Sequence, residues 1–90
     1  MSEGRHQKIM KTFGTRLRKA REAKGYKSAA AFAGVLNLEP HTYRKYERGA
    51  AECNYDTLTR MCELLDITPN DLLPLAAKRA QAGNRETRAA

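Results

Sequence analysis

Four basic side chains recur at helical spacing in the segment 40–48. They fall at positions i, i+3, i+4 and i+7 and therefore share one face of a helix: His41, Arg44, Lys45 and Arg48. Such side chains can hydrogen-bond to guanine O6 and N7 in the DNA major groove, which is wide enough to admit an α-helix. A solvated charged face explains the same spacing, so the pattern alone leaves both interpretations open.

The opposite face of the same segment carries Tyr43, Tyr46 and Glu47 at i, i+3 and i+4, and we expect this face to pack against the core. A carboxylate on a core-facing stripe is costly unless a cation pairs with it. Arg21 is the nearest plausible cation, because it lies one helical step from Leu17 on the inner side of an earlier helical segment. The sequence therefore predicts an ion pair between Arg21 and Glu47 with a structural role.

Apolar spacing and capping residues predict the first two helices. Apolar side chains at intervals of four, four and three predict a helix over residues 8–24, which Gly25 ends. Ser28 then supplies an N-cap oxygen for a short alanine-rich helix over 29–36. The residues of this second helix that we expect to face inward are Phe32, Val35 and Leu36.

The remaining helices follow from the same signals. The helix over 40–48 begins at a proline and ends before a glycine, and Asn54 caps a helix over 55–65. A short helix begins at Pro69, and the segment 75–82 is compatible with a short sixth helix. No segment alternates with a period of two, so the predicted fold class is all-α. The second and third helices, joined by a tight turn, have the proportions of a helix-turn-helix.

Charge is distributed unevenly along the 90 residues, which carry a formal net charge of +7. The front half and the C-terminal tail are basic, whereas the segment 49–75 is acidic. We expect a flexible N-terminus over 1–7, one domain over 8–75, and a basic tail over 76–90 that is partly helical and then disordered. The charge favours a polyanionic partner.

Other classes of function find little support in the sequence. His6 and His41 do not combine with Cys53 and Cys62 at zinc-site spacings, so we expect no metal and no cofactor. There is no glycine-rich phosphate loop, no convergent catalytic triad and no carboxylate pair, so we do not expect an enzyme. No apolar stretch approaches the roughly 18–20 residues of a membrane span. We therefore expect no membrane partner and a cytoplasmic protein that joins the nucleoid when it binds DNA.

Three stretches of the chain carry a family resemblance. They read FGTRLRKAREAKG from Phe13, SAAAFAGVLNLEPHTYRKYERG from Ser28 and YDTLTRMCELLDITPNDLL from Tyr55. Together they resemble the five-helix, lambda-repressor-like DNA-binding domain of the Cro and cI phage-repressor family, also called the xenobiotic-response-element family. The resemblance implies that the helix over 29–36 lies across the DNA backbone and that the helix over 40–48 reads the major groove.

The resemblance also implies roles for single residues. It places the base-contacting positions at Pro40, His41, Thr42, Arg44 and Lys45. It implies phosphate contacts from Lys27, Ser28, Arg48, Asn54 and Tyr55. The chain departs from the family at Ala29, where a glutamine often grips a phosphate, and at Pro40, whose side chain offers apolar contact alone.

These observations predict a sequence-specific transcription regulator of repressor type that binds double-stranded DNA at an inverted-repeat operator as a homodimer. We expect the dimer contacts to come from Leu72, Leu73, Leu75 and Ala76. The alternative is an antitoxin-type interaction module that autoregulates its operon and holds a protein partner through residues 76–90. Equally, the cations of this tail could follow DNA phosphates.

Overall fold

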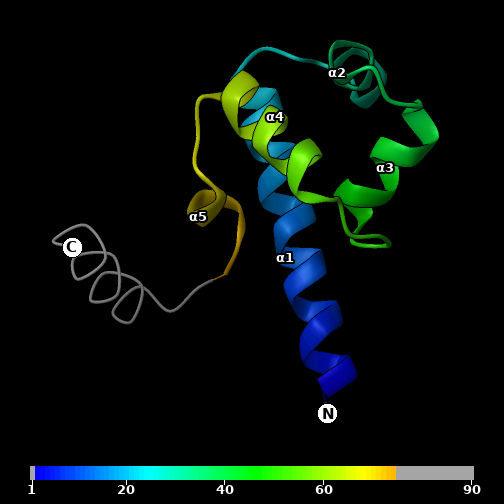
Figure 1. Cartoon of the computed structure of the whole chain (residues 1–90), viewed down its shortest axis with the longest axis vertical. Coiled ribbons are helices and arrows are strands. Elements are labelled where there is room, and N and C mark those ends of the chain that lie inside the picture. Colours follow the sequence, from blue (N-terminus) through cyan, green and yellow to red (C-terminus); the bar gives the residue numbers. More distant parts are fainter. Residues whose placement is uncertain (1, 75–90) are drawn as a thin grey trace, which may run out of the picture.

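The chain folds into helices joined by short turns, as the computed structural model of residues 2–74 shows. The described residues form five helices and no strand (Figure 1), which confirms the predicted all-α class. The helices are α1 (Ser2–Ala23), α2 (Ala29–Leu36), α3 (Pro40–Arg48), α4 (Tyr55–Leu65) and α5 (Pro69–Leu72).

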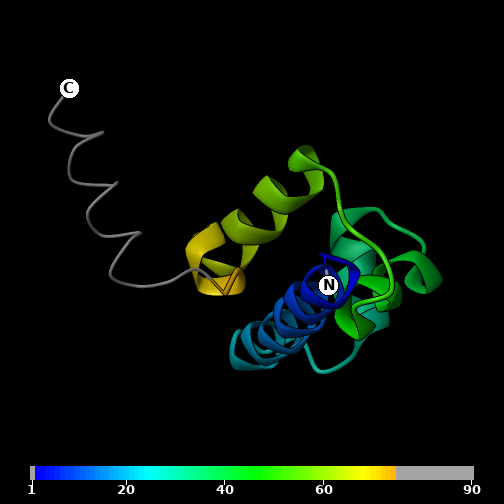
Figure 2. The same ribbon diagram turned by 90° about the horizontal axis from the view of Figure 1, so that it is seen from below.

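Helix α1 is the longest element, and the other helices gather around its C-terminal half (Figure 1). It packs against α3 on one side and α5 on the other, and Figure 2 shows these two helices flanking it. Helix α2 contacts both α3 and α4, so the pair α2 and α3 closes over the core from the side away from α5. The N-terminal half of α1 extends beyond this cluster (Figure 1).

The core lies where these helices meet. It is built from one continuous cluster of buried side chains: Phe13, Leu17, Phe32, Ala33, Leu36, Tyr43, Tyr46, Met61, Cys62, Leu65 and Leu72. Within it, the rings of Phe32 and Tyr43 meet edge to face with centroids 5.4 Å apart, which joins α2 to α3 through an aromatic contact. The tyrosine stripe of α3 therefore faces inward, as its spacing predicts.

Local capping explains where α2, α3 and α4 begin and end. Ser28 Oγ accepts a hydrogen bond from the Ala31 N–H at 3.0 Å, and Asn54 Oδ1 accepts one from the Thr57 N–H at 2.8 Å. Asn37 ends α2 in the left-handed conformation, as does Gly49 for α3. The predicted bounds of these three helices are confirmed because each depends on residues next to it in sequence.

Two glycines allow α1 and α3 to approach closely. A Cβ atom at Gly14 would lie 2.2 Å from the carbonyl oxygen of Glu47, which is backbone and cannot move aside easily. Gly49 has a φ of 74°, and a Cβ there would lie 2.8 Å from the Cα of Lys11. The α1 and α3 backbones are therefore in contact at positions where no other residue type fits without a shift.

The N-terminal boundary of α1 differs from the prediction. The helix begins at Ser2 instead of residue 8, so residues 2–7, which we expected to precede the first helix, are part of it. These first residues are polar and carry no apolar stripe, so the burial pattern could not reveal them as helical. Once Phe13 and Leu17 anchor a helix, each added residue extends it without a new nucleation cost.

Two apolar side chains face the opposite way from the prediction. Val35 was expected to point inward but is 46% exposed, because Phe32, Ala33 and Leu36 already cover the inner face of α2. Leu72, an expected dimer contact, is fully buried in the core and cannot reach a second copy, whereas Leu73 is half-buried. Leu75, Ala76, the sixth helix and the tail over 76–90 lie outside the described residues.

Candidate nucleic-acid interface

Helix α3 divides its side chains between the core and the solvent. Tyr43 is fully buried and Tyr46 nearly so, whereas His41, Arg44 and Arg48 are exposed. Lys45, Thr42 and Pro40 are half-buried at the edges of the exposed face. The residues to which the resemblance assigned base contact therefore lie on the outer side of α3 or at its edges.

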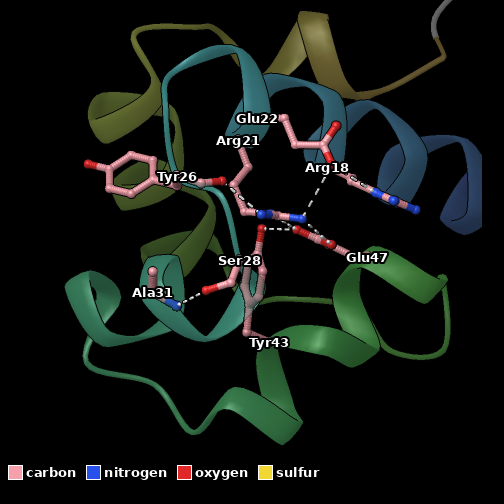
Figure 3. A network of polar contacts seen from close by, with 8 residues as sticks. All are labelled: Arg18, Arg21, Glu22, Tyr26, Ser28, Ala31, Tyr43 and Glu47. Carbon is pink, nitrogen blue, oxygen red and sulfur yellow. Dashed lines mark hydrogen bonds and ion pairs between the residues drawn. The ribbon is translucent and has the colours of Figure 1, made fainter.

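A buried carboxylate fixes α3 to α1. Arg21 Nε donates to Glu47 Oε2 at 2.7 Å, and a second hydrogen bond of 3.4 Å runs from the same guanidinium to Oε1. The Nη1 of Arg21 donates to the carbonyl of Tyr26 at 2.8 Å (Figure 3). The side chains of Arg21 and Glu47 are only 5% and 11% exposed, so the predicted ion pair is present and is mostly removed from water.

Tyr43 completes this network from within α3. Its hydroxyl donates to the same Glu47 Oε2 at 2.5 Å, so one carboxylate oxygen accepts from two residues (Figure 3). Burial, with the hydrogen bond and charge of Glu47, raises the pKa of Tyr43 well above its ordinary value. Burial alone would lower the pKa of Arg21, but the hydrogen bond and the negative charge of Glu47 have a larger combined effect and raise this pKa. With their pKa values raised, the Tyr43 hydroxyl and the Arg21 guanidinium both keep their protons at neutral pH.

Above this network lies a shallow hollow of about 360 Å³ where α1, the start of α2 and α3 meet. Its exposed cationic lining comes from all three regions: Arg18, Lys27, Arg44 and Arg48. Ser28 lines it too, at the N-terminus of α2, where backbone N–H groups and the helix dipole favour an anion. Glu47 also borders the hollow, but its charge is already paired with Arg21.

The comparisons with known proteins agree with this geometry. A family described as a helix-turn-helix domain matches residues 12–75, which include α2, the turn and α3. The chain belongs to this family. A similar protein is the SPbeta prophage-derived uncharacterized HTH-type transcriptional regulator YonR of Bacillus subtilis strain 168. It is 41% identical over 61 residues, covering 68% of the chain and 56% of the relative. No solved structure gives a significant match.

In this helix-turn-helix domain the two capping residues still have donors to offer. Ser28 Oγ accepts from the backbone of α2, which leaves its hydroxyl proton free to point outward. Asn54 uses its side-chain oxygen as the cap of α4, which leaves the amide nitrogen as a donor. Both side chains are exposed, as are Lys27 and Tyr55. The expected phosphate-contacting residues are therefore accessible at their positions.

Sequence reasoning missed two parts of the site. Arg18 lines the cationic hollow, and it also forms an ion pair of 3.3 Å with Glu22 one turn away. The signal was present, because Arg18 lies three residues before Arg21 on the same helix. The Tyr43 hydroxyl was the second omission, and its i, i+4 spacing to Glu47 could have indicated the bond.

Two further searches concern residues 2–74 only. Within this range, no cluster of three or more His, Cys, Asp or Glu side chains could hold a metal ion. Over the same residues, none of the helices combines the length and apolar character that crossing a bilayer requires. Cys62 is buried in the core, and neither it nor Cys53 forms a disulfide.

Proposed function

We propose that the chain is a sequence-specific, double-stranded-DNA-binding regulator of transcription. One observation carries the proposal: α3 is locked to α1 through the buried network while its opposite face and the adjoining hollow present cations to solvent. A rigid helix with outward Arg and Lys side chains suits the major groove. The family match and the regulator named among its relatives support this assignment.

We divide the proposed contacts with DNA into contacts with base edges and contacts with backbone phosphates. We assign base contacts to the outer side chains of α3, namely Pro40, His41, Thr42, Arg44 and Lys45. Phosphate contacts come from residues around that face, namely Lys27, Ser28, Arg48, Asn54 and Tyr55. Arg18 joins the second group, because it lines the hollow together with Arg48 and Ser28.

The regulator acts as a repressor that binds an inverted repeat as a homodimer. A domain seated over a promoter blocks polymerase by occupancy and needs no activation surface. Two copies related by a two-fold axis place their recognition helices about 34 Å apart, one turn of DNA, so the operator has matching half-sites. The chain spans little more than half of its curated relative, so the relative's name supports this proposal only for the shared part.

Duplexes selected from a random pool test the proposal. Arg44→Ala is expected to lose about 1–3 kcal/mol on the selected site and to relax preference at one base position, because it removes a guanine contact. Arg48→Ala should weaken binding equally on all sequences and lower the salt slope by about one. Arg60→Ala on α4, outside the hollow, serves as the charge-matched control. Equal binding of selected and random duplexes by the unaltered chain would refute the proposal.

A further inference from the structure

The outer side of α1 carries a run of cations that extends beyond the cationic hollow. From Gly4 to Arg21 the helix contains seven lysines or arginines and no aspartate or glutamate. Arg18 lines the hollow, Arg21 belongs to the buried network, and Arg16 donates to the carbonyl of Leu73 at 3.0 Å. Four exposed cations of the run take part in none of these contacts: Arg5, Lys8, Lys11 and Lys19.

Such a run is unfavourable for a helix without an anionic partner. Lys8 and Lys11 lie three residues apart on one face, and like charges at close helical spacing repel each other. Arg5 lies in the first turn of α1, where the helix dipole disfavours a cation. Among the described residues, no ion pair involves these three side chains. A polyanion bound along this face would reduce both penalties.

One stripe of this face adjoins the cationic hollow. Lys11 and Arg18 lie seven residues apart, two helical turns, so their side chains share one side of α1. Lys8 and Thr15 have the same spacing and are exposed beside them. A separate hollow of about 310 Å³ lies on α1 alone, and its lining contains cations and hydroxyls but no acid: Lys11, Thr12, Thr15, Arg16 and Lys19. The cationic surface therefore continues from the hollow toward the N-terminus of α1.

The same stripe lies beside the end of α3. Gly49 directly follows Arg48, and a Cβ atom at Gly49 would lie 2.8 Å from the Cα of Lys11. Lys11 is therefore close to Arg48, to which we assign a phosphate contact. From Arg18 to Lys8 the helix rises about 15 Å, over which one strand of DNA carries about four phosphates. This geometry suits a DNA backbone that passes Arg48 and continues along α1.

We propose that Lys8, Lys11 and Thr15 form a second contact with the phosphate backbone of the duplex that α3 reads, outside the base pairs that α3 touches. The two ammonium groups pair with phosphates, and the Thr15 hydroxyl donates to one. Figure 1 shows the half of α1 that carries Lys8 extending past the other helices, where it can reach further DNA. Lys8 and Lys11 precede residue 12, where the family match begins, so this contact adds to the matched domain.

The inference rests on the proposed function, because it requires a bound duplex. Phosphate contacts carry no sequence information, so this contact raises affinity without changing base preference. It is therefore measurable apart from the base contacts of α3. The quantity that reports it is the slope of log affinity against log salt concentration, which changes by about 0.9 for each phosphate neutralised.

Binding of the full chain to its selected duplex at several salt concentrations tests the inference. The selected site carries one turn of random flanking DNA, about 10 bp, on each side. Lys8→Gln and Lys11→Gln should each lower the magnitude of the salt slope by about 0.9, and the double variant by about 1.8. Arg60→Gln on α4, which lines neither hollow, is the control and should leave the slope unchanged. Thermal melts followed by circular dichroism check that each variant folds.

Ethylation of single phosphates locates the contact. Some phosphates outside the base pairs whose identity matters should weaken binding of the unaltered chain when ethylated, yet have no effect on the double variant. The ratio of affinities for selected and random duplexes should be the same in both proteins, because neither lysine contacts a base.

Three results would overturn the inference: a double variant with an unchanged salt slope, a fall in slope no larger than that of Arg60→Gln, or a loss of base preference in the double variant. The proposed function can fail separately. A chain that binds all duplexes equally, with a slope that the double variant lowers, keeps this contact and refutes the function. A chain that prefers its selected duplex but shows no change in slope keeps the function and refutes the contact.

Discussion

Replacing Glu47 with alanine tests whether the buried network holds α3 in place. In the variant, Arg21 keeps its hydrogen bond to the Tyr26 carbonyl but loses both bonds to the carboxylate. The Tyr43 hydroxyl loses its acceptor in the same step. A guanidinium that is 5% exposed is then left with a single, more distant counter-charge, the Glu22 carboxylate 3.9 Å from its Nη2.

The expected loss follows from these burials. Removing one partner of a buried ion pair costs about 3–5 kcal/mol, most of it from the stranded charge. Glu47 is 11% exposed, so some water can reach Arg21, and we expect a value near the lower end, about 3 kcal/mol. A small domain holds only about 5–15 kcal/mol of stability in total. A loss of about 3 kcal/mol lowers the melting temperature by roughly 12–24 °C in a domain of this size.

Urea unfolding followed by far-UV circular dichroism at pH 7 measures the loss. Glu22→Ala is the matched control, because Glu22 also pairs with an arginine of α1 but is 48% exposed. This substitution should lower the free energy of unfolding by less than about 1 kcal/mol. The double variant Arg21→Met with Glu47→Leu removes both charges and should recover most of the stability. A Glu47→Ala variant no less stable than Glu22→Ala would refute the structural role of the pair.

Two more predictions concern the same packing. Gly14→Ala should destabilise the domain by about 1–3 kcal/mol, because the new Cβ meets the α3 backbone, although alanine has the better helix propensity. Gly34→Ala is the matched comparison, because the space around Gly34 is open, and it should stabilise the domain by up to about 1 kcal/mol. Urea unfolding measures both changes. The raised pKa of Tyr43 predicts that the contribution of this residue to stability is complete below pH 10, where unfolded tyrosine is also protonated, and falls above it. Tyr43→Phe should flatten this alkaline decline, and an unchanged decline would contradict the assignment.

Much of the fold could be predicted because its signals are local. Ser28 and Asn54 mark helix starts by their own side chains, and Gly49 marks an end by its own backbone. The pair of Arg21 and Glu47 was also predictable, since a carboxylate on an apolar stripe needs a cation and few were within reach. In each case the type of residue and its neighbours in sequence restrict the local structure or the partner that it can have.

The errors arose where tertiary contacts decide. Val35 and Leu72 have similar apolar side chains, and only the positions of neighbouring helices make one exposed and the other buried. The close approach of α1 to α3 at Gly14 left no periodic signal, because glycine carries no side chain to count. An apolar cavity beside Tyr55 was equally invisible, since its walls come from three separated parts of the chain, namely α1, residues 51–58 and Leu73.

The buried pair also explains how an acid can border a surface that we propose to bind phosphates. Glu47 lines the cationic hollow, and an unpaired carboxylate there would repel a phosphate. Because Arg21 neutralises it from the inner side, the exposed charges of the hollow on α3 are those of Arg44 and Arg48. The Arg21→Met, Glu47→Leu variant leaves this net charge unchanged. It should therefore keep DNA affinity together with stability, whereas Arg21→Met alone should weaken both.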